Sequence, residues 1–336
     1  MTAPLRCTDL PTLDDIRAAA DLVYTAVPPT LQCAWPLLCE RAGAEVWVKH
    51  ENHTPIGAFK VRGGLVLLDQ LRREHPELVA VDGVRSGAGV ITATRGNHGQ
   101  SIGFAARRLG IHAVIAVPHG NSSEKNNAMR ALGVELIEHG DDFQAAREQS
   151  EKLAIDRNLV PIPPFHEALV RGVATYGLEF LSAAPPLDAV YVPIGMGSGI
   201  CATVAARQAL NLTTQIIGVV SDHAPTYALS FAAGKPVPHA VSTELADGVA
   251  CRQPDDQALQ IIMRHVERIV RVTDIEVGAA MRHYFTDTHN VAEGAAAAPL
   301  AALLQEKGRM AGKRVGLILT GGNVDAAVFS AVLNSE

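Results

Sequence analysis

The sequence has few aromatic residues and no strong excess of either charge. Phe, Trp and Tyr make up 4% of its 336 residues, the formal net charge is -6, and no basic stripe stands out. Proteins that bind nucleic acid carry clustered Lys and Arg, so we expect no nucleic-acid partner. A hydrophobic content of 48% excludes a disordered chain and indicates a globular protein rich in Ala, Val and Leu.

Long apolar runs are also missing. No stretch approaches the roughly 20 consecutive apolar residues that a membrane-spanning helix needs. Residues 1–6 lead into no apolar segment of the kind found in signal peptides. We therefore expect no membrane partner and a cytoplasmic location.

Cysteine is scarce, and histidine is scattered. The cysteines number five, an odd count, and lack the paired spacing of a zinc site, while the 13 histidines show no close ligand spacing. Reduced thiols in a cytoplasmic protein are the favoured interpretation, and no metal site is expected. The cysteines are Cys7, Cys33, Cys39, Cys201 and Cys251.

Short apolar runs alternate with amphipathic segments along the chain. This alternation predicts the α/β class, with open, twisted, mostly parallel sheets in two lobes and helices on both faces. Helices are expected to start at Thr12, where Asp15 completes a capping box, and at Asn97, and to span residues 62–74, 122–132 and 141–157. The expected strands are residues 45–49, 90–93, 113–117, 134–137, 159–161, 189–192, 215–220, 268–272 and 315–319.

The spacing of these elements predicts two domains of unequal size. Strand and helix units follow one another closely from about residue 85, and the prolines of residues 161–164 disfavour both a helix and a central strand. A length of 336 residues suits two unequal lobes. We therefore divide the chain into a large domain, residues 1–84 and 167–336, and a small inserted domain, residues 85–166.

Lys60 is the most informative single residue. It lies among small, apolar and glycine residues in Gly-Ala-Phe-Lys-Val-Arg-Gly-Gly, residues 57–64. A lysine in apolar surroundings loses hydration, which favours the neutral amine, a usable nucleophile or base. The alternative is a solvated lysine at the start of an amphipathic helix.

Two glycine-containing turns follow expected strands. They are Thr-Arg-Gly-Asn-His-Gly-Gln at residues 94–100 and Pro-Ile-Gly-Met-Gly-Ser-Gly-Ile at residues 193–200. Free N–H groups at a helix start bind anions, and glycine lets the backbone approach them closely. Each turn alone is also explained as a tight strand-to-helix connection. Together with Lys60, they indicate chemistry on a carbonyl, such as that of a phosphorylated aldehyde cofactor.

These three motifs, with Leu-Thr-Gly-Gly-Asn at residues 319–323 as a fourth, resemble a known family. The family is the serine/threonine dehydratases, pyridoxal-phosphate (PLP) enzymes of fold type II that also include serine racemase. The resemblance runs from about Thr25 to the C-terminus. It implies a tryptophan synthase β-like fold, PLP bound by the large domain and an amino acid as substrate. We also expect a homodimer.

The resemblance implies a role in PLP binding for several matched residues. Lys60 would hold PLP as a Schiff base, and Phe59 would flank the ring. Asn97 would hydrogen-bond the phenolic oxygen, and Thr320 would place its hydroxyl opposite the pyridine nitrogen. Gly248 would lie on the other face of the ring, with Glu293 near the site. The phosphate would be bound by the backbone of Gly195, Met196, Gly197, Ser198 and Gly199.

The resemblance likewise implies the reaction. Water would be eliminated from a β-hydroxy amino acid of the threonine or serine type, giving a 2-oxo acid and ammonia. A specialised substrate, such as 3-hydroxyaspartate or phenylserine, and a β-replacement reaction are the alternatives. A binding module without catalysis would not need an activated lysine. The substrate would be bound by Thr94, Arg95, Gly96, Asn97 and His98.

Three features depart from the family pattern. Arg95 stands where racemising members have a serine that acts on the second face of the α-carbon, and a permanently charged guanidinium cannot act as an acid or base there. Residues 221–223 read Ser-Asp-His where many relatives bind a metal through a glutamate, so no metal is carried over. Met196 and Ser198 replace glycines of the usual phosphate loop, but backbone N–H groups would still do the binding.

Overall fold

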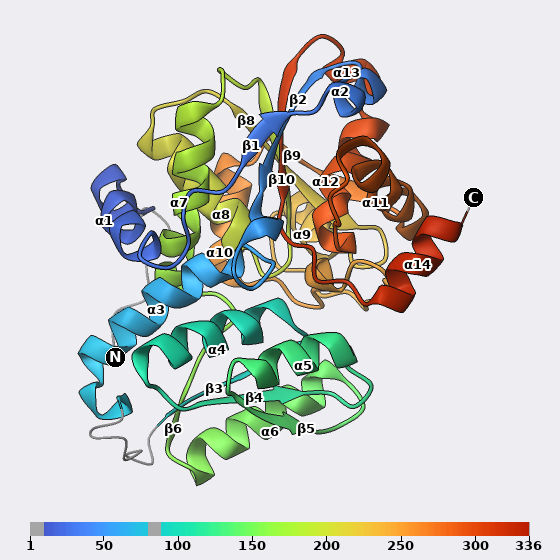
Figure 1. The fold of residues 1–336 in the computed structure, drawn as a ribbon. Helices are drawn as coiled ribbons and strands as arrows, with labels where there is room; N and C mark the ends of the chain where they lie inside the picture. The colour runs from blue at the N-terminus through green and yellow to red at the C-terminus, as the bar shows by residue number, and fades with distance from the viewer. Residues whose placement is uncertain (1–9, 80–88, 336) are drawn as a thin grey trace. The chain divides into compact units, whose positions relative to one another are not determined.

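The computed structural model describes residues 10–79 and 89–335 (Figure 1). These residues form two compact units, one containing the chain up to Phe59 and from Val173 onward, the other Lys60–Gly172. The smaller unit therefore starts earlier than residue 85, because helix α3 (Lys60–Glu74) packs along helix α4 (Asn97–Leu109). The domain limits at residues 84/85 and 166/167 stay a prediction.

A six-stranded sheet forms the centre of the larger unit. Its strand order is β1-β2-β10-β7-β8-β9, and every neighbouring pair is parallel except β1 and β2. The bounds are β1 (Gln32–Ala34), β2 (Glu45–His50), β10 (Arg314–Leu319), β7 (Ala189–Pro193), β8 (Gln215–Ser221) and β9 (Arg268–Val272). The prediction of a mostly parallel α/β fold is confirmed. Strand β1 was not expected, since three residues contain no apolar run.

The helices around this sheet pack either on its strands or on one another. They are α1 (Leu13–Val23), α2 (Pro36–Ala42), α7 (Glu167–Ala183), α8 (Ser198–Ala209), α9 (Thr226–Ala233), α10 (Asp256–His265), α11 (Asp274–Thr288), α12 (Gly294–Gln305), α13 (Lys307–Met310) and α14 (Ala326–Asn334), with short 3-10 turns η1 (Glu51–His53) and η3 (Asp247–Val249). Helix α1 begins with the predicted capping box between Thr12 and Asp15. Among the described helices, none combines the length and hydropathy of a transmembrane segment.

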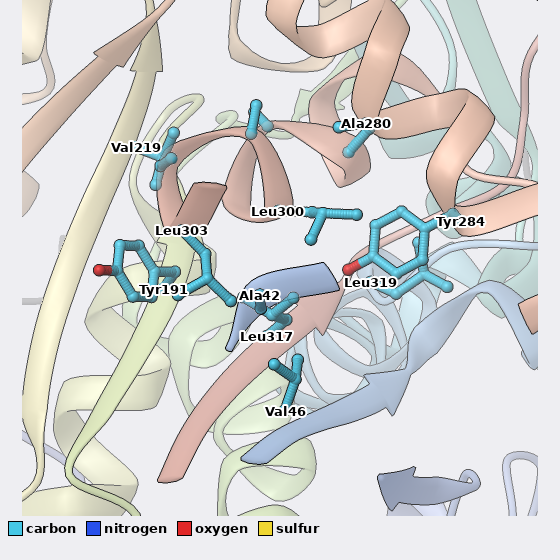
Figure 2. Packing of buried hydrophobic residues seen from close by; sticks show 14 of the residues in the cluster. Ala42, Val46, Tyr191, Val219, Ala280, Tyr284, Leu300, Leu303, Leu317 and Leu319 are labelled. Atoms are coloured by element: carbon cyan, nitrogen blue, oxygen red, sulfur yellow. The ribbon is translucent and has the colours of Figure 1, made fainter. Parts of the chain in front are cut away.

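The core of the larger unit lies between the sheet and helices α11 and α12. Helix α12 packs across β7, β8, β9 and β10, and its alanines allow it to approach the sheet closely. Leu300 and Leu303 from this helix join Val46, Tyr191 and Leu317 from the sheet in one fully buried cluster (Figure 2). Burial of such side chains stabilises a fold by about 1.5–3 kcal/mol each. The sheet is thus a rigid support for the loops at its carboxyl edge.

A second, four-stranded parallel sheet forms the smaller unit, in the order β5-β4-β3-β6. The elements are η2 (Pro76–Leu78), β3 (Gly89–Ala93), β4 (Ala113–Val117), α5 (Ser123–Ala131), β5 (Glu135–Glu138), α6 (Phe143–Asp156) and β6 (Leu159–Pro161). Helix α6 packs on β3, β4 and β6, while α4 and α5 lie against β4 and β5 (Figure 1). Pro161, which lacks an N–H donor, lies in the edge strand β6, where proline is tolerated.

Candidate active site

The loop between β7 and α8 presents backbone N–H groups that have no acceptor among the residues that the structure describes. Gly197 precedes the helix in a left-handed conformation, with φ of 101°, which glycine adopts at no steric cost. The first hydrogen bond of α8 runs from the Cys201 N–H to the Gly197 carbonyl, at 3.0 Å. Within the described chain, nothing accepts a hydrogen bond from the N–H of Gly197, Ser198 or Gly199. These buried donors suit an anion such as phosphate.

Gly195, in the same loop, lies against the turn that contains Gly248. A Cβ added to Gly195 would be 2.4 Å from the Gly248 carbonyl oxygen. Gly248, within η3, is in turn so close to helix α12 that its own added Cβ would be 2.8 Å from the Cβ of Ala295. The fold therefore brings two predicted site residues, 53 positions apart in the sequence (248 − 195), into backbone contact.

Phe59 packs at the start of α8. Its ring meets the Tyr176 ring edge to face, with centroids 6.1 Å apart and an interplanar angle of 85°. A Cβ on Gly199 would be 3.5 Å from the Phe59 ring, an ordinary van der Waals contact. The Phe59 ring therefore lies beside the loop that carries these N–H groups.

Thr320, the residue after β10, lies beside the same segment. Its carbonyl accepts a hydrogen bond from the Phe59 N–H at 2.9 Å, and Gly321 forms an antiparallel bridge with Ala58. Thr320 is buried, yet its hydroxyl makes no hydrogen bond to any described residue, including the two glycines that follow it. The hydroxyl is thus available to a ligand rather than used as a cap for the turn.

Glu293 joins this group from the start of α12. Its N–H donates to the Gly321 carbonyl at 3.1 Å, and a Cβ added to Gly321 would be 2.7 Å from Glu293 Oε1. The side chain is buried and does not cap its own helix. Glu293 and Thr320 therefore lie close together at the carboxyl edge of the sheet, and their roles stay predictions.

In the smaller unit, Lys60 is the first residue of α3 and is partly exposed. Its carbonyl accepts a hydrogen bond from the Ser101 hydroxyl of α4 at 2.5 Å. One turn further along α3, a Cβ on Gly64 would be 2.9 Å from the Ser101 carbonyl oxygen. Only glycine permits this close approach of the two helices, so Gly64 and Ser101 together set the position of Lys60 relative to α4.

Asn97 and His98 begin helix α4. Burial, and secondarily the charge of Lys60, lower the pKa of His98 to about 3. His98 is therefore neutral at physiological pH, and its buried Nε2 has no hydrogen-bond partner among the described residues. A neutral imidazole near Lys60 can bind a substrate without adding a competing charge.

A lysine from helix α5 lies beside the turn before α4, a neighbour that the sequence did not indicate. The Gly96 N–H donates to the Thr94 hydroxyl at 3.0 Å, and Arg95 between them is exposed. A Cβ on Gly96 would be 2.5 Å from Cδ of Lys125, a buried residue of α5. Lys125 belongs to the polar run Asn-Ser-Ser-Glu-Lys-Asn-Asn, residues 121–127. Such a run is typical of a solvated helix start, so no local signal distinguished Lys125.

His50 is a second buried histidine that sequence reasoning missed. It is the last residue of β2, opposite Leu319 of β10, and its Nε2 is 3.0 Å from the indole Nε1 of Trp35. The indole nitrogen can only donate, so Nε2 must be unprotonated. Burial, followed by the charge of His53, lowers the pKa of His50 to about 4. Protonation of His50 is therefore less favourable in the folded state than in the unfolded chain, so it destabilises the fold.

We predict that His50→Gln reduces the loss of stability at acid pH. A histidine whose pKa is lower in the folded state than the ordinary 6.5 stabilises the fold fully above pH 6.5, and this contribution is lost as the pH falls toward 4. When the pH is lowered from 7.5 to 5, the free energy of unfolding of the wild type should fall by about 2 kcal/mol more than that of the variant. Urea denaturation at both pH values measures this difference. The exposed His239→Gln is the matched control, and an equal pH response in both variants would contradict the prediction.

In residues 10–79 and 89–335, no group of three or more His, Cys, Asp or Glu side chains is arranged to hold a metal ion. The described cysteines, Cys33, Cys39, Cys201 and Cys251, are free thiols. Burial raises the pKa of Cys251 to about 12, so this thiol stays protonated and inert.

The residues of the larger unit fit a phosphorylated aromatic cofactor. Unused N–H donors at the start of α8 suit a phosphate, and Phe59 lies beside them. The Thr320 hydroxyl suits a ring heteroatom, since it has no other described partner. In the smaller unit, Lys60 and His98 are close enough to interact electrostatically. The chain thus has an amine for a carbonyl group and an anion site for a phosphate.

Comparison with known proteins identifies the family. The pyridoxal-phosphate dependent enzyme family matches residues 25–321. An L-threonine ammonia-lyase of Thermotoga maritima is 30% identical over 324 residues, 96% of this chain and 78% of that enzyme. The biosynthetic L-threonine dehydratase of Haemophilus influenzae is 32% identical over 307 residues, 90% of this chain but 58% of the relative. Maize serine racemase has a similar structure, with a TM-score of 0.87 and 25% identity over 96% of this chain and 97% of that one. The chain belongs to the family of pyridoxal-phosphate dependent enzymes.

Proposed function

We propose that the protein is an ammonia-lyase that eliminates water from a β-hydroxy amino acid of the threonine or serine type. The observation that carries this proposal is the convergence of the unused N–H donors of α8, Phe59 and the Thr320 hydroxyl at the carboxyl edge of the sheet. The relatives named L-threonine ammonia-lyase and L-threonine dehydratase support the same reaction.

The proposed roles in PLP binding follow the family resemblance residue by residue. Lys60 would bind the aldehyde, Asn97 the phenolic oxygen and Thr320 the ring nitrogen. Phe59 and Gly248 would contact the ring, with Glu293 beside it. The phosphate would be held by the backbone N–H groups of Gly195, Met196, Gly197, Ser198 and Gly199. When bound, PLP withdraws electrons from the α-carbon of an amino acid.

Lys60 supplies the base in this proposal. Its Nζ would accept the proton from the α-carbon of the substrate, since an amine released from a carbonyl is a neutral base. The N–H groups at the start of α4, in the turn of Thr94, Arg95, Gly96, Asn97 and His98, would hold the substrate carboxylate. Neutral His98 would contribute a polar contact without a charge.

Thr320 favours elimination over slower reactions. A hydroxyl, unlike a carboxylate, does not keep a neighbouring pyridine nitrogen protonated. The negative charge at the substrate's α-carbon would then be stabilised less. Prompt loss of the β-hydroxyl would be favoured over persistence of that charge. The chain's own residue at this position is therefore consistent with a lyase.

Arg95 bears on substrate choice. Its exposed guanidinium, next to the carboxylate-binding turn, suits bidentate binding of a second carboxylate on the substrate, as in 3-hydroxyaspartate. The competing role is a simple ion pair with an acidic neighbour, which would contribute little at an exposed position. Because a guanidinium does not exchange protons at neutral pH, we propose no racemase activity.

The test of this proposal is a substrate panel with purified holoenzyme: L-threonine, L-serine, threo-3-hydroxyaspartate and an aryl-serine. We expect equal amounts of 2-oxo acid and ammonia, and unreacted substrate that keeps its configuration. Accumulation of the enantiomer would contradict the assignment, as would a β-substituted amino acid formed on addition of a thiol. A metal chelator is expected to leave activity unchanged.

The same panel with Arg95→Ser tests the role of Arg95. If the guanidinium binds a side-chain carboxylate, kcat/KM for 3-hydroxyaspartate should fall about tenfold more than kcat/KM for threonine. Arg95→Lys, which keeps the charge but not the bidentate geometry, is the matched control and should lose part of the effect. An equal change for all substrates would make threonine the preferred substrate and refute the idea.

We also propose a cytoplasmic homodimer that binds neither nucleic acid nor metal. Support for a reducing compartment comes from Cys33, Cys39, Cys201 and Cys251, which are free thiols. The dimer rests on the family resemblance. Light scattering of the purified protein would measure its mass directly.

A further inference from the structure

Tyr227, in α9, is bonded to the phosphate loop and to the turn before α10. Its hydroxyl donates to the Met196 carbonyl at 3.1 Å and accepts from the Asp255 N–H at 3.0 Å. The side chain is 1% exposed, so no water competes for these bonds. Burial raises the pKa of Tyr227, so the phenol keeps its proton and remains a donor.

The bond to Met196 determines where the next N–H points. A peptide unit is planar and trans, so its C=O and N–H groups point in opposite directions. The Met196 carbonyl and the Gly197 N–H belong to the same peptide unit. With the carbonyl held by Tyr227, the Gly197 N–H is directed away from Tyr227, and no described residue accepts from it.

The loop itself has little means of holding this orientation. Gly195, Gly197 and Gly199 have no side chains to pack, and glycine loses more conformational freedom on ordering than any other residue. Met196 lies outside helix α8, and in the described chain its carbonyl accepts no backbone hydrogen bond. Tyr227 is therefore the group that fixes this peptide plane.

Tyr176 offers a natural comparison. Its hydroxyl, also fully buried, donates to the Gly199 carbonyl at 2.9 Å. Gly199 lies inside the first turn of α8, where the Thr203 hydroxyl donates to the same carbonyl at 3.0 Å. Removal of the Tyr176 hydroxyl thus leaves the Gly199 peptide plane held, whereas removal of the Tyr227 hydroxyl releases that of Met196.

We infer that Tyr227 is a positioning residue for the phosphate of the cofactor: it holds the Met196–Gly197 peptide so that the Gly197 N–H faces the anion before the cofactor binds. This inference rests on the proposed PLP site. Preorganised N–H donors bind an anion more tightly, because the entropy cost of ordering the loop does not have to be met when the anion binds.

The test compares PLP with pyridoxal, which has the same aldehyde and ring but no phosphate. For Tyr227→Phe, we expect the Kd of PLP to rise about tenfold, which corresponds to about 1.4 kcal/mol. The Kd of pyridoxal should stay within twofold of the wild type. For Tyr176→Phe, the Kd of both ligands should stay within twofold. Thermal unfolding of the two apo variants shows whether loss of a buried hydroxyl destabilises them alike.

Unchanged PLP affinity in Tyr227→Phe would overturn the inference. So would an equal weakening of PLP and pyridoxal, since Tyr227 would then act on the whole site rather than on the phosphate loop. The experiment measures the binding of PLP and pyridoxal and is independent of elimination activity. A wild-type protein that binds PLP but eliminates no water would therefore refute the proposed reaction while the role of Tyr227 stands, and one that binds no PLP would refute both.

Discussion

Replacement of Lys60 by alanine is expected to abolish elimination, with a fall in kcat of about 10⁴-fold. The amine would be lost both as the attachment point of the cofactor and as the base for the α-proton. The fold should persist, because the hydrogen bond between the Lys60 carbonyl and the Ser101 hydroxyl involves the backbone and remains in the variant. Lys152→Ala, an exposed lysine of α6, is the matched control and should keep full activity.

Borohydride reduction provides an independent measurement of the same site. Reduction of the wild-type holoenzyme should fix the cofactor to the peptide that contains Phe59, Lys60 and Val61, as read by mass spectrometry after proteolysis. The Lys60→Ala protein should carry no label. Recovery of the label on Lys125, which is buried beside Gly96, would show that the wrong lysine had been assigned.

Gly195→Ala is expected to have the second largest effect, a loss of PLP affinity of about 10-fold to 100-fold. The new Cβ would be 2.4 Å from the Gly248 carbonyl oxygen. Because the obstacle is backbone, one of two loops must move, and such overpacking costs about 1–3 kcal/mol. Gly195 is not among the glycines with positive φ, so the effect would come from this contact rather than from backbone strain.

Gly308→Ala is the matched control for this substitution. Gly308 lies in α13 with no atom within 4 Å of an added Cβ, and its φ is not positive. Alanine there should leave stability unchanged or raise it slightly, since the unfolded chain loses freedom. Titration of both apo variants with PLP measures the contrast. If Gly195→Ala bound PLP with wild-type affinity, the loops of Gly195 and Gly248 could separate without cost, which would contradict the prediction.

The sequence predicted the parallel strands well because each is a short apolar run followed by a turn. Residues 113–117 and 268–272 agree with β4 and β9 at both ends. Helix α3 begins at Lys60, two residues earlier than expected, because the turn of residues 57–59 ends in a hydrogen bond from Phe59 to Thr320. No local pattern could indicate that bond between residues 261 positions apart (320 − 59).

The candidate site was predicted where a motif is local. Lys60, the turn at residues 94–98 and the loop at residues 195–199 each combine chemistry and backbone geometry within a few residues. Tyr227, Lys125 and His50 were missed, because a tyrosine, a lysine or a histidine in a short helix or strand is usually structural or solvated. Lys125 and Tyr227 are buried beside Gly96 and Gly197, and His50 is buried beside Trp35; none of these contacts shows in a local sequence pattern.

The sequence by itself determined the fold class, the family and the motifs that would bind PLP, because periodicity and glycine spacing are local properties of the chain. Only the tertiary structure decided which carbonyls and N–H groups in those motifs are already used. No described residue accepts from the N–H groups of Gly197, Ser198 and Gly199, while the Tyr227 hydroxyl donates to the Met196 carbonyl. The physical reason is that a hydrogen bond depends on the distance and direction between two groups, which long-range packing sets.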